Sequence, residues 1–159
     1  MENYYFFWNE TPFSQWAKSK FVIDDIVYNC AEQYMMACKA RMFGDRDKEI
    51  SIMEATHPRE QKQLGRQVKG FHSDRWNNVA WDIVYDGNKA KFTQNKKMKE
   101  QLFETYPKIL VEASPYDKIW GIGLNAKDAQ NTSPDEWPGS NWLGQVLTEL
   151  RNDLMCKNL

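Results

Sequence analysis

The stretch YNCAEQYMMACKARMF, from Tyr28 to Phe43, predicts the central helix of the fold. Its methionines and its final phenylalanine recur at roughly helical spacing. Asn29 is a favourable residue for a helix start, and Glu32 follows three residues later, as in a capping box. We therefore expect a helix that begins at Asn29 and ends near Phe43.

Two ionisable residues of this helix, Glu32 and Lys39, are expected to share one face. Residues seven apart lie about 20° from eclipsed at 3.6 residues per turn. Met35, Met36 and Phe43 lie on or beside the same stripe, so two charges interrupt an otherwise buried surface. Such groups are costly when buried unless they are paired or used. Two explanations stay open here: a chemical pair, or a capping-box glutamate with a snorkelling lysine amine.

The other segments predict an α+β fold, predominantly α-helical, in a single domain that spans residues 1–159. A chain of this length holds one sizeable core. Apolar and aromatic runs predict short strands over 4–8, 21–23, 26–28 and 109–111, with a hairpin around Asp24-Asp25. Amphipathic spacing predicts further helices over 46–55, 58–68, 73–92, 97–106 and 141–154.

Several of these helices carry boundary signals. His57 is interpreted as a helix-start residue, because Pro58 suits the first turn that follows it. Ser73 is the expected cap of the helix 73–92, in which Gly87 is a candidate break. Pro107 is expected to end the helix 97–106.

The segment from Ser114 to Ser140 predicts a long loop, because glycine, proline, asparagine and aspartate are concentrated in it. A loop of this length usually carries function or is disordered. Its tryptophans, Trp120 and Trp137, argue for order. The glycine pattern that begins at Gly121 lacks the strand-helix-strand context of a dinucleotide fingerprint, so a Rossmann fold is excluded.

Charge, hydropathy and cysteine usage narrow the function classes. The 21 Lys and Arg residues nearly balance the 22 Asp and Glu residues, so no strong global field attracts a polyanion. No apolar run approaches the roughly 18 residues of a membrane span, and no secretion signal is visible. Three cysteines without CxxC spacing favour reduced thiols. We therefore expect a cytoplasmic protein that is not bound to a membrane. His57 and His72 do not form part of a metal-binding motif.

A series of ordered motifs covers nearly the whole chain and resembles one family. The motifs are Phe13-Ser14-Gln15-Trp16, Ala31-Glu32-Gln33-Tyr34 with Lys39-Ala40, Leu64-Gly65-Arg66, Trp76, Lys91-Phe92 with Gln94-Asn95, Glu112-Ala113-Ser114 with Asp117 and Trp120-Gly121, and Asn141 with Leu143-Gly144, Leu147 and Arg151. Together they resemble the NADAR family, the YbiA-like N-glycosidases. Departures are modest: Thr148 stands where methionine is common, and the loop Lys127–Pro138 is longer than in minimal members.

The resemblance implies a YbiA-like fold and hydrolysis of an N-glycosidic bond between ribose and a base. The implied substrates are ADP-ribosylated guanine, free or in single-stranded nucleic acid, and phosphoribosylated intermediates of the riboflavin pathway. No metal and no redox cofactor are implied. A non-catalytic module that binds ADP-ribose or NAD is the alternative from another function class. The oligomeric state stays open.

The chemistry of such a bond assigns roles to the two charged residues of the helix. Cleavage develops positive charge on the sugar and negative charge on the leaving base. Glu32 is the candidate for the sugar side. Lys39 has two open roles, as a proton donor to the leaving group or as a Schiff-base nucleophile.

The expected substrate contacts lie along the rest of the chain. Trp76 and Trp120 are candidate platforms for a base or sugar, with helix packing as the alternative for Trp76. Asp117 is a candidate polar contact, and Asn141 is either a helix cap or a ligand contact. Phosphate oxygens are expected to meet backbone amides near Gly121 and Gly123, with Arg66 as a further partner.

Overall fold

The computed structural model describes residues 1–157, which fall into two compact units. The insert unit comprises Gln15–Asn95. The terminal unit comprises Met1–Ser14 together with the chain from Lys96 onward. The insert unit is therefore a continuous segment, whereas the terminal unit is assembled from both ends of the chain.

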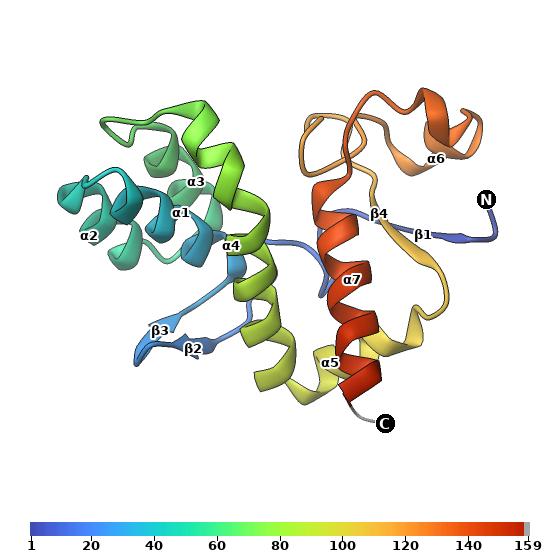
Figure 1. Cartoon of the computed structure of the whole chain (residues 1–159), viewed down its shortest axis with the longest axis horizontal. Helices are drawn as coiled ribbons and strands as arrows, with labels where there is room; N and C mark the ends of the chain where they lie inside the picture. Colours follow the sequence, from blue (N-terminus) through green and yellow to red (C-terminus); the bar gives the residue numbers. More distant parts are fainter. Residues whose placement is uncertain (158–159) are drawn as a thin grey trace. The chain divides into compact units, whose positions relative to one another are not determined.

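The insert unit is built around one helix. It contains the hairpin strands β2 (Phe21–Ile23) and β3 (Ile26–Tyr28), followed by α1 (Ala31–Met42), α2 (Arg46–Glu54), α3 (Pro58–Arg66) and α4 (Ser73–Gln94). α1 contacts α2, α3 and α4 as well as β3, so the predicted central helix is confirmed (Figure 1). The surrounding helices cover α1, which explains why its residues from Ala31 to Ala40 are mostly buried.

The hairpin of the insert unit has the predicted turn. Asp24 and Asp25 both adopt a positive φ, of 52° and 66°, as the tightest hairpin turns require. β2 and β3 pair antiparallel around them, with Phe21 opposite Tyr28. The side chain of Gln94 at the end of α4 bonds both the N–H and the carbonyl of Val22, each at 2.8 Å. The last turn of α4 thus closes one edge of the hairpin.

The start of α1 differs from the prediction. The residue that caps α1 is Cys30, without a side-chain cap bond, so the capping box of Asn29 and Glu32 is wrong. The Asn29 side chain is engaged elsewhere, because its Nδ2 donates to the carbonyl of Ala55 and its Oδ1 accepts from Gln61. These are long-range bonds that local spacing does not show. The backbone N–H of Asn29 donates to Gln33 Oε1 at 2.8 Å.

The longest helix, α4, is confirmed with two corrections. It is capped by His72, whose ring accepts from the N–H of Arg75, and not by Ser73. It also continues through Gly87 without a break. A Cβ at Gly87 would lie 2.7 Å from the ring of Tyr34, so the glycine is explained by close packing of α1 on α4. His57 caps α3 as predicted, with its Nδ1 accepting from Arg59.

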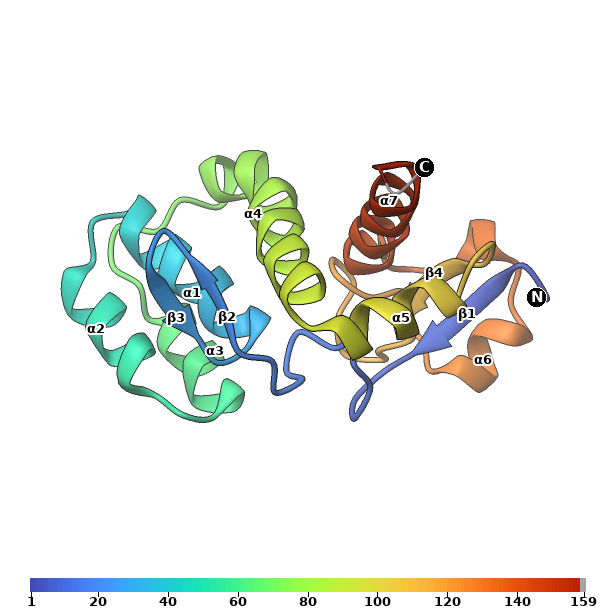
Figure 2. The same ribbon diagram turned by 90° about the horizontal axis from the view of Figure 1, so that it is seen from below.

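The terminal unit is organised by two parallel strands from distant parts of the sequence. β1 (Tyr4–Phe7) pairs with β4 (Ile109–Glu112), beginning with Tyr4 opposite Ile109, and the two run side by side in Figure 2. α7 packs on β4 and contacts α5. The helices of this unit are α5 (Lys96–Glu104), α6 (Ala126–Gln130) and α7 (Trp142–Lys157), with a 3-10 turn over Pro134–Glu136.

The long segment between β4 and α7 is more regular than expected. It contains α6, which Asn125 caps by accepting from the N–H of Asp128, and the 3-10 turn. Trp137 packs edge-on against Tyr4 and donates its indole N–H to Ala129. The expectation of a long loop over this segment is therefore corrected by these two short helical elements, and Trp137 packs in an ordered position as its residue type predicted.

The predicted fold class is confirmed: the described residues are mainly helical, with a few short strands. None of the helices within residues 1–157 combines the length and apolar character needed to cross a bilayer.

Candidate active site

Glu32 and Lys39 lie on α1 in the insert unit, and their charges interact. Glu32 is 6% exposed, and its backbone N–H donates to the carbonyl of Gln15 at 3.0 Å. Lys39 is half-buried about two turns along the same helix. The Glu32 carboxylate raises the pKa of Lys39, so the two groups are within electrostatic range of each other. The shared face that the spacing predicts is therefore present.

The net effect of the surroundings is to lower the pKa of Lys39. Burial is the largest cause, because it disfavours the charged ammonium. The positive charge of Arg66 at the end of α3 lowers the pKa further, while Glu32 opposes both. A lysine amine in this environment is neutral more often than an exposed one at the same pH.

Aromatic rings flank the Lys39 ammonium. Its Nζ lies 4.4 Å from the ring centroid of Phe71 and 6.0 Å from that of Trp76. Trp76 is 6% exposed and belongs to the core of α4, whereas Phe71 is 43% exposed in the loop before α4. The structure thus brings Glu32, Lys39, Arg66 and Trp76 together. It adds Phe71, which no helical or strand periodicity relates to Lys39 and which only the turn residue Gly70 precedes.

A buried polar network lies behind Glu32. The Asn88 side chain on α4 donates from Nδ2 to Gln15 Oε1 and to the carbonyl of Val84, both at 2.8 Å. Gln15 in turn holds the N–H of Glu32 through its own carbonyl. Asn88 Oδ1 is buried and accepts no hydrogen bond within the described part of the chain. The network fixes the start of α1 against α4, and sequence spacing did not reveal it.

Two further titratable residues lie at the same end of α1. The Lys91 side chain is fully buried, and burial lowers its pKa to about 7. Burial raises the pKa of Cys30 to about 11, and the nearby charges of Glu32 and Lys91 act on it in opposite directions. The Cys30 thiol donates to Gln61 Oε1 at 3.1 Å. Glu32 therefore belongs to a group of buried ionisable side chains rather than to an isolated pair.

The remaining predicted contacts lie in the terminal unit, around the start of the segment that follows β4. Asp117 Oδ1 accepts from the backbone N–H groups of Ile119 and Trp120, both at 2.8 Å. Trp120 packs edge-on against Trp142, with ring centroids 5.5 Å apart. Asp117 thus forms the turn that presents Trp120, and its role as a substrate contact stays a prediction.

The glycines of this segment are required by close packing. A Cβ at Gly121 would lie 2.9 Å from the carbonyl oxygen of Asp117 and 3.0 Å from that of Glu112. Gly123 has a φ of +76°, which favours glycine. The Ile122 N–H between them donates to the carbonyl of Glu112. Binding of phosphate by the amides of Gly121 and Gly123 stays a prediction.

Asn141 links the start of α7 to β4. Its Oδ1 accepts from the N–H of Glu112 at 2.9 Å, and its Nδ2 donates to the carbonyl of Leu110 at 3.1 Å. Its φ of 54° is unusual for a residue other than glycine. These bonds use both ends of the amide to hold the strand, which explains an asparagine at this position.

No cluster of three or more His, Cys, Asp or Glu side chains within residues 1–157 is placed to hold a metal ion. His57 and His72 serve as helix caps in the insert unit.

Comparison with known proteins identifies relatives that match most of the chain. N-glycosidase R617 of Acanthamoeba polyphaga mimivirus is 48% identical over 126 residues, which are 79% of this chain and 74% of that protein. Protein irg-1 of Caenorhabditis elegans is 41% identical over 132 residues, 82% of this chain and 62% of that protein. Riboflavin biosynthesis protein PYRR of Zea mays is 32% identical over 114 residues, 69% of this chain but 16% of that protein.

A solved structure has the same fold. The NMR structure of the E. coli protein YbiA superposes with a TM-score of 0.80 at 24% identity, covering 98% of this chain and 87% of that one. The family model of the NADAR domain matches residues 5–155. This match spans almost all of the chain, and together with the relative of 48% identity it shows that the chain belongs to the NADAR family.

Proposed function

We propose that this protein is an N-glycosidase that hydrolyses the bond between a ribose and a base. Members of the family named as N-glycosidases support the activity class. The observation that carries the proposal is the interacting pair of Glu32 and Lys39 on one face of α1, with Arg66 and Trp76 beside Lys39. Glu32 is buried and Lys39 is half-buried. Charges act more strongly on a reacting group when they are withdrawn from water.

The reaction needs one group on each side of the bond that breaks. The C–N bond breaks with its electron pair moving to the base nitrogen, which takes up a proton, and the anomeric carbon acquires the oxygen of water. Glu32 is assigned to the sugar side, where a carboxylate stabilises developing positive charge or orients the attacking water. Lys39 is assigned either to protonation of the leaving nitrogen or to covalent attack.

The two roles of Lys39 predict different products under reducing conditions. If Lys39 attacks the anomeric carbon, the C–N bond to the base breaks, the base leaves with a proton, and opening of the ribose ring gives a Schiff base between Nζ and that carbon. Water then hydrolyses the Schiff base, whereas borohydride reduces it to a stable secondary amine. Mass spectrometry of the peptide that contains Lys39 would then show the added sugar. Rapid turnover in borohydride without any adduct on Lys39 assigns the residue to proton donation.

The preferred substrate is ADP-ribosylated guanine, as a nucleotide or in a short single strand. The balanced charge of the chain favours such small substrates over long duplexes. The exposed Arg66, which the sequence offered as a phosphate partner, lies close enough to Lys39 to lower its pKa. A guanidinium beside the reacting groups suits a substrate that carries phosphate next to its ribose.

A second candidate substrate class is a phosphoribosylated intermediate of riboflavin synthesis. It is favoured by the similarity to PYRR of Zea mays, a protein named for riboflavin biosynthesis. The matched part is only 16% of that protein, so the similarity supports the alternative less strongly than the N-glycosidase relatives support the general class.

Parallel incubations test the proposal. The purified protein is incubated with ADP-ribosylated guanine nucleotide and with a phosphoribosylated pyrimidine intermediate, and the products are identified by mass spectrometry. We expect release of ADP-ribose and unmodified guanine nucleotide from the first substrate. Cleavage of the second alone selects the riboflavin class, and cleavage of neither, with binding of ADP-ribose retained, selects a non-catalytic module.

We propose that the enzyme works in the cytoplasm. Its proposed substrate is a small molecule or a nucleotide. Cys30, Cys38 and Cys156 are all free thiols, which suits a reducing compartment. That the chain forms one functional domain also stays a prediction.

A further inference from the structure

The loop between α3 and α4 in the insert unit carries an aromatic ring to the proposed catalytic lysine. Phe71 lies in this loop, and its ring centroid is 4.4 Å from the Lys39 Nζ. An ammonium within about 6 Å of a ring centroid is attracted by the negative face of the ring. Phe71 is 43% exposed, so its ring is not part of the buried core of the unit.

The position of Phe71 is fixed by contacts with the end of α1. Its ring meets that of Phe43 edge to face, with centroids 5.4 Å apart. Arg75 lies over the other ring, 5.6 Å from the Phe43 centroid. Arg75, Phe43 and Phe71 thus form a row of contacting side chains, and the Lys39 ammonium contacts the last of them.

The backbone of the same loop is tied to the start of α2. The Asp45 carboxylate accepts from the N–H of Lys69 at 2.8 Å and from the N–H of Lys48 at 3.1 Å. Gly70 follows with a φ of +76°, which turns the chain toward Phe71. The loop is therefore held at its backbone by Asp45 and at the ring of Phe71 by Phe43.

We propose that Phe71 is a positioning residue, whose ring holds the Lys39 ammonium in place beside Trp76 and favours its charged form. This inference rests on the proposed function, because it concerns the lysine to which the chemistry is assigned. The charged groups that act on Lys39 are Glu32 on its own helix and Arg66 on α3. Phe71 adds an uncharged influence on the same ammonium, so its removal leaves both charges unchanged.

The test measures the titration of Lys39 without any substrate. Acetic anhydride reacts with the neutral amine only, so the pH dependence of Lys39 acetylation, followed by mass spectrometry, gives its pKa. Phe71→Leu keeps an apolar side chain but removes the ring. We expect the Lys39 midpoint to move to lower pH, with about two- to five-fold faster acetylation at a fixed pH below it. The acetylation rate reaches a plateau at high pH, where the amine is fully neutral. Dividing by this plateau rate corrects for any change in the access of the reagent to Lys39.

Two further variants complete the test. Phe71→Tyr retains the ring and is expected to keep the wild-type midpoint. Phe103→Leu removes another ring that has a lysine over it, 5.6 Å from the Lys99 Nζ in the terminal unit, and is expected to leave Lys39 unchanged. Circular dichroism confirms that each variant is folded.

The outcomes separate this inference from the proposed function. An unchanged Lys39 midpoint in Phe71→Leu overturns the positioning role, even if the protein cleaves its substrate. A midpoint that moves to lower pH in Phe71→Leu and stays at the wild-type value in Phe71→Tyr supports the role, even if neither tested substrate is cleaved, whereas a move to higher pH in Phe71→Leu overturns it.

Discussion

At the scale of single residues, Glu32 is a buried carboxylate on α1, with 6% of its surface exposed. It lies in the first turn of the helix, after the capping residue Cys30. Its carboxylate raises the pKa values of both Lys39 and Cys30. A buried carboxylate among ionisable neighbours is a common property of catalytic sites.

Replacement of Glu32 by glutamine is expected to reduce turnover by about 100- to 10,000-fold, the usual contribution of a general acid or base. The fold should be retained because glutamine has nearly the same shape. Steady-state kinetics with circular dichroism check both expectations. Glu60→Gln, on the exposed face of α3, is the matched control. Turnover equal to that of the control would remove Glu32 from the chemistry.

Arg66→Gln is expected to raise the pKa of Lys39, because the positive charge of Arg66 lowers it. If the neutral amine is the nucleophile, the rise of kcat with pH moves to higher pH in the variant. If the ammonium is the proton donor, kcat falls as the pH rises, and this fall also moves to higher pH in the variant. Since Arg66 is exposed, the difference from wild type should shrink at high salt.

The matched control for this experiment is Arg59→Gln, on an exposed position of α3. It removes the same charge from the same helix. A shift of equal size in both variants would mean that the net charge of the protein, and not Arg66 itself, sets the titration of Lys39.

At the scale of secondary structure, Gly144 determines how α7 meets β4. A Cβ at this position would collide with the carbonyl oxygen of Leu110 and with the amide group of Asn141. Those two residues are joined to each other by the hydrogen bond that anchors the start of α7. The strand carbonyl belongs to the backbone, so it has little freedom to move aside.

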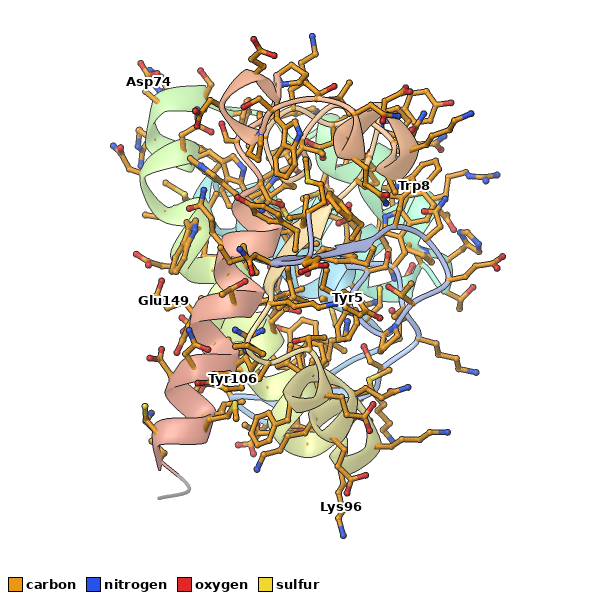
Figure 3. The ribbon with its side chains drawn as sticks, turned by 90° about the vertical axis from the view of Figure 1, so that its right-hand side faces the viewer. Tyr5, Trp8, Asp74, Lys96, Tyr106 and Glu149 are labelled. Atoms are coloured by element: carbon orange, nitrogen blue, oxygen red, sulfur yellow. The ribbon has the colours of Figure 1, made fainter. Side chains whose placement is uncertain are left out.

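Gly144→Ala is therefore expected to destabilise the protein by about 1–3 kcal/mol, as other overpacked cores do. Thermal unfolding followed by circular dichroism measures the change. Glu149→Ala, on the exposed side of the same helix in Figure 3, is the control and should change the melting temperature little. A Gly144→Ala protein as stable as the control would show that α7 can shift away from β4 at little cost.

Local signals predicted most of the elements because those signals act between near neighbours. Pro58 and the hairpin turn at Asp24 and Asp25 are examples, since each restricts its own backbone. The capping of α1 could not be found in this way. The Asn29 side chain bonds Ala55 and Gln61, which lie 26 and 32 residues further along the chain.

Only part of the candidate site could be predicted from the sequence. Helical spacing placed Glu32 and Lys39 on one face, and the structure brings Arg66 and Trp76 to them. Phe71 was missed because it lies in a loop, where no periodicity relates it to Lys39. Asn88 was missed because a buried asparagine on an amphipathic helix has no distinctive spacing.

At the scale of the whole molecule, the chain divides into a continuous insert unit and a terminal unit made from both ends. The sequence prediction of one domain implies that the two units unfold together. Differential scanning calorimetry of the full chain should then show one transition, with equal calorimetric and van't Hoff enthalpies. Two separable transitions, or a calorimetric enthalpy well above the van't Hoff value, would mean that the units are independent domains.

The pairing of β1 with β4 also sets the order in which a newly made chain can assemble. Tyr4 is translated before its partner Ile109, which is added about a hundred residues later. At roughly 5–20 residues per second, β1 waits on the order of 5–20 seconds for β4. The aromatic strand β1 is thus translated well before the strand that pairs with it, and a chaperone would meet it unpaired throughout that interval.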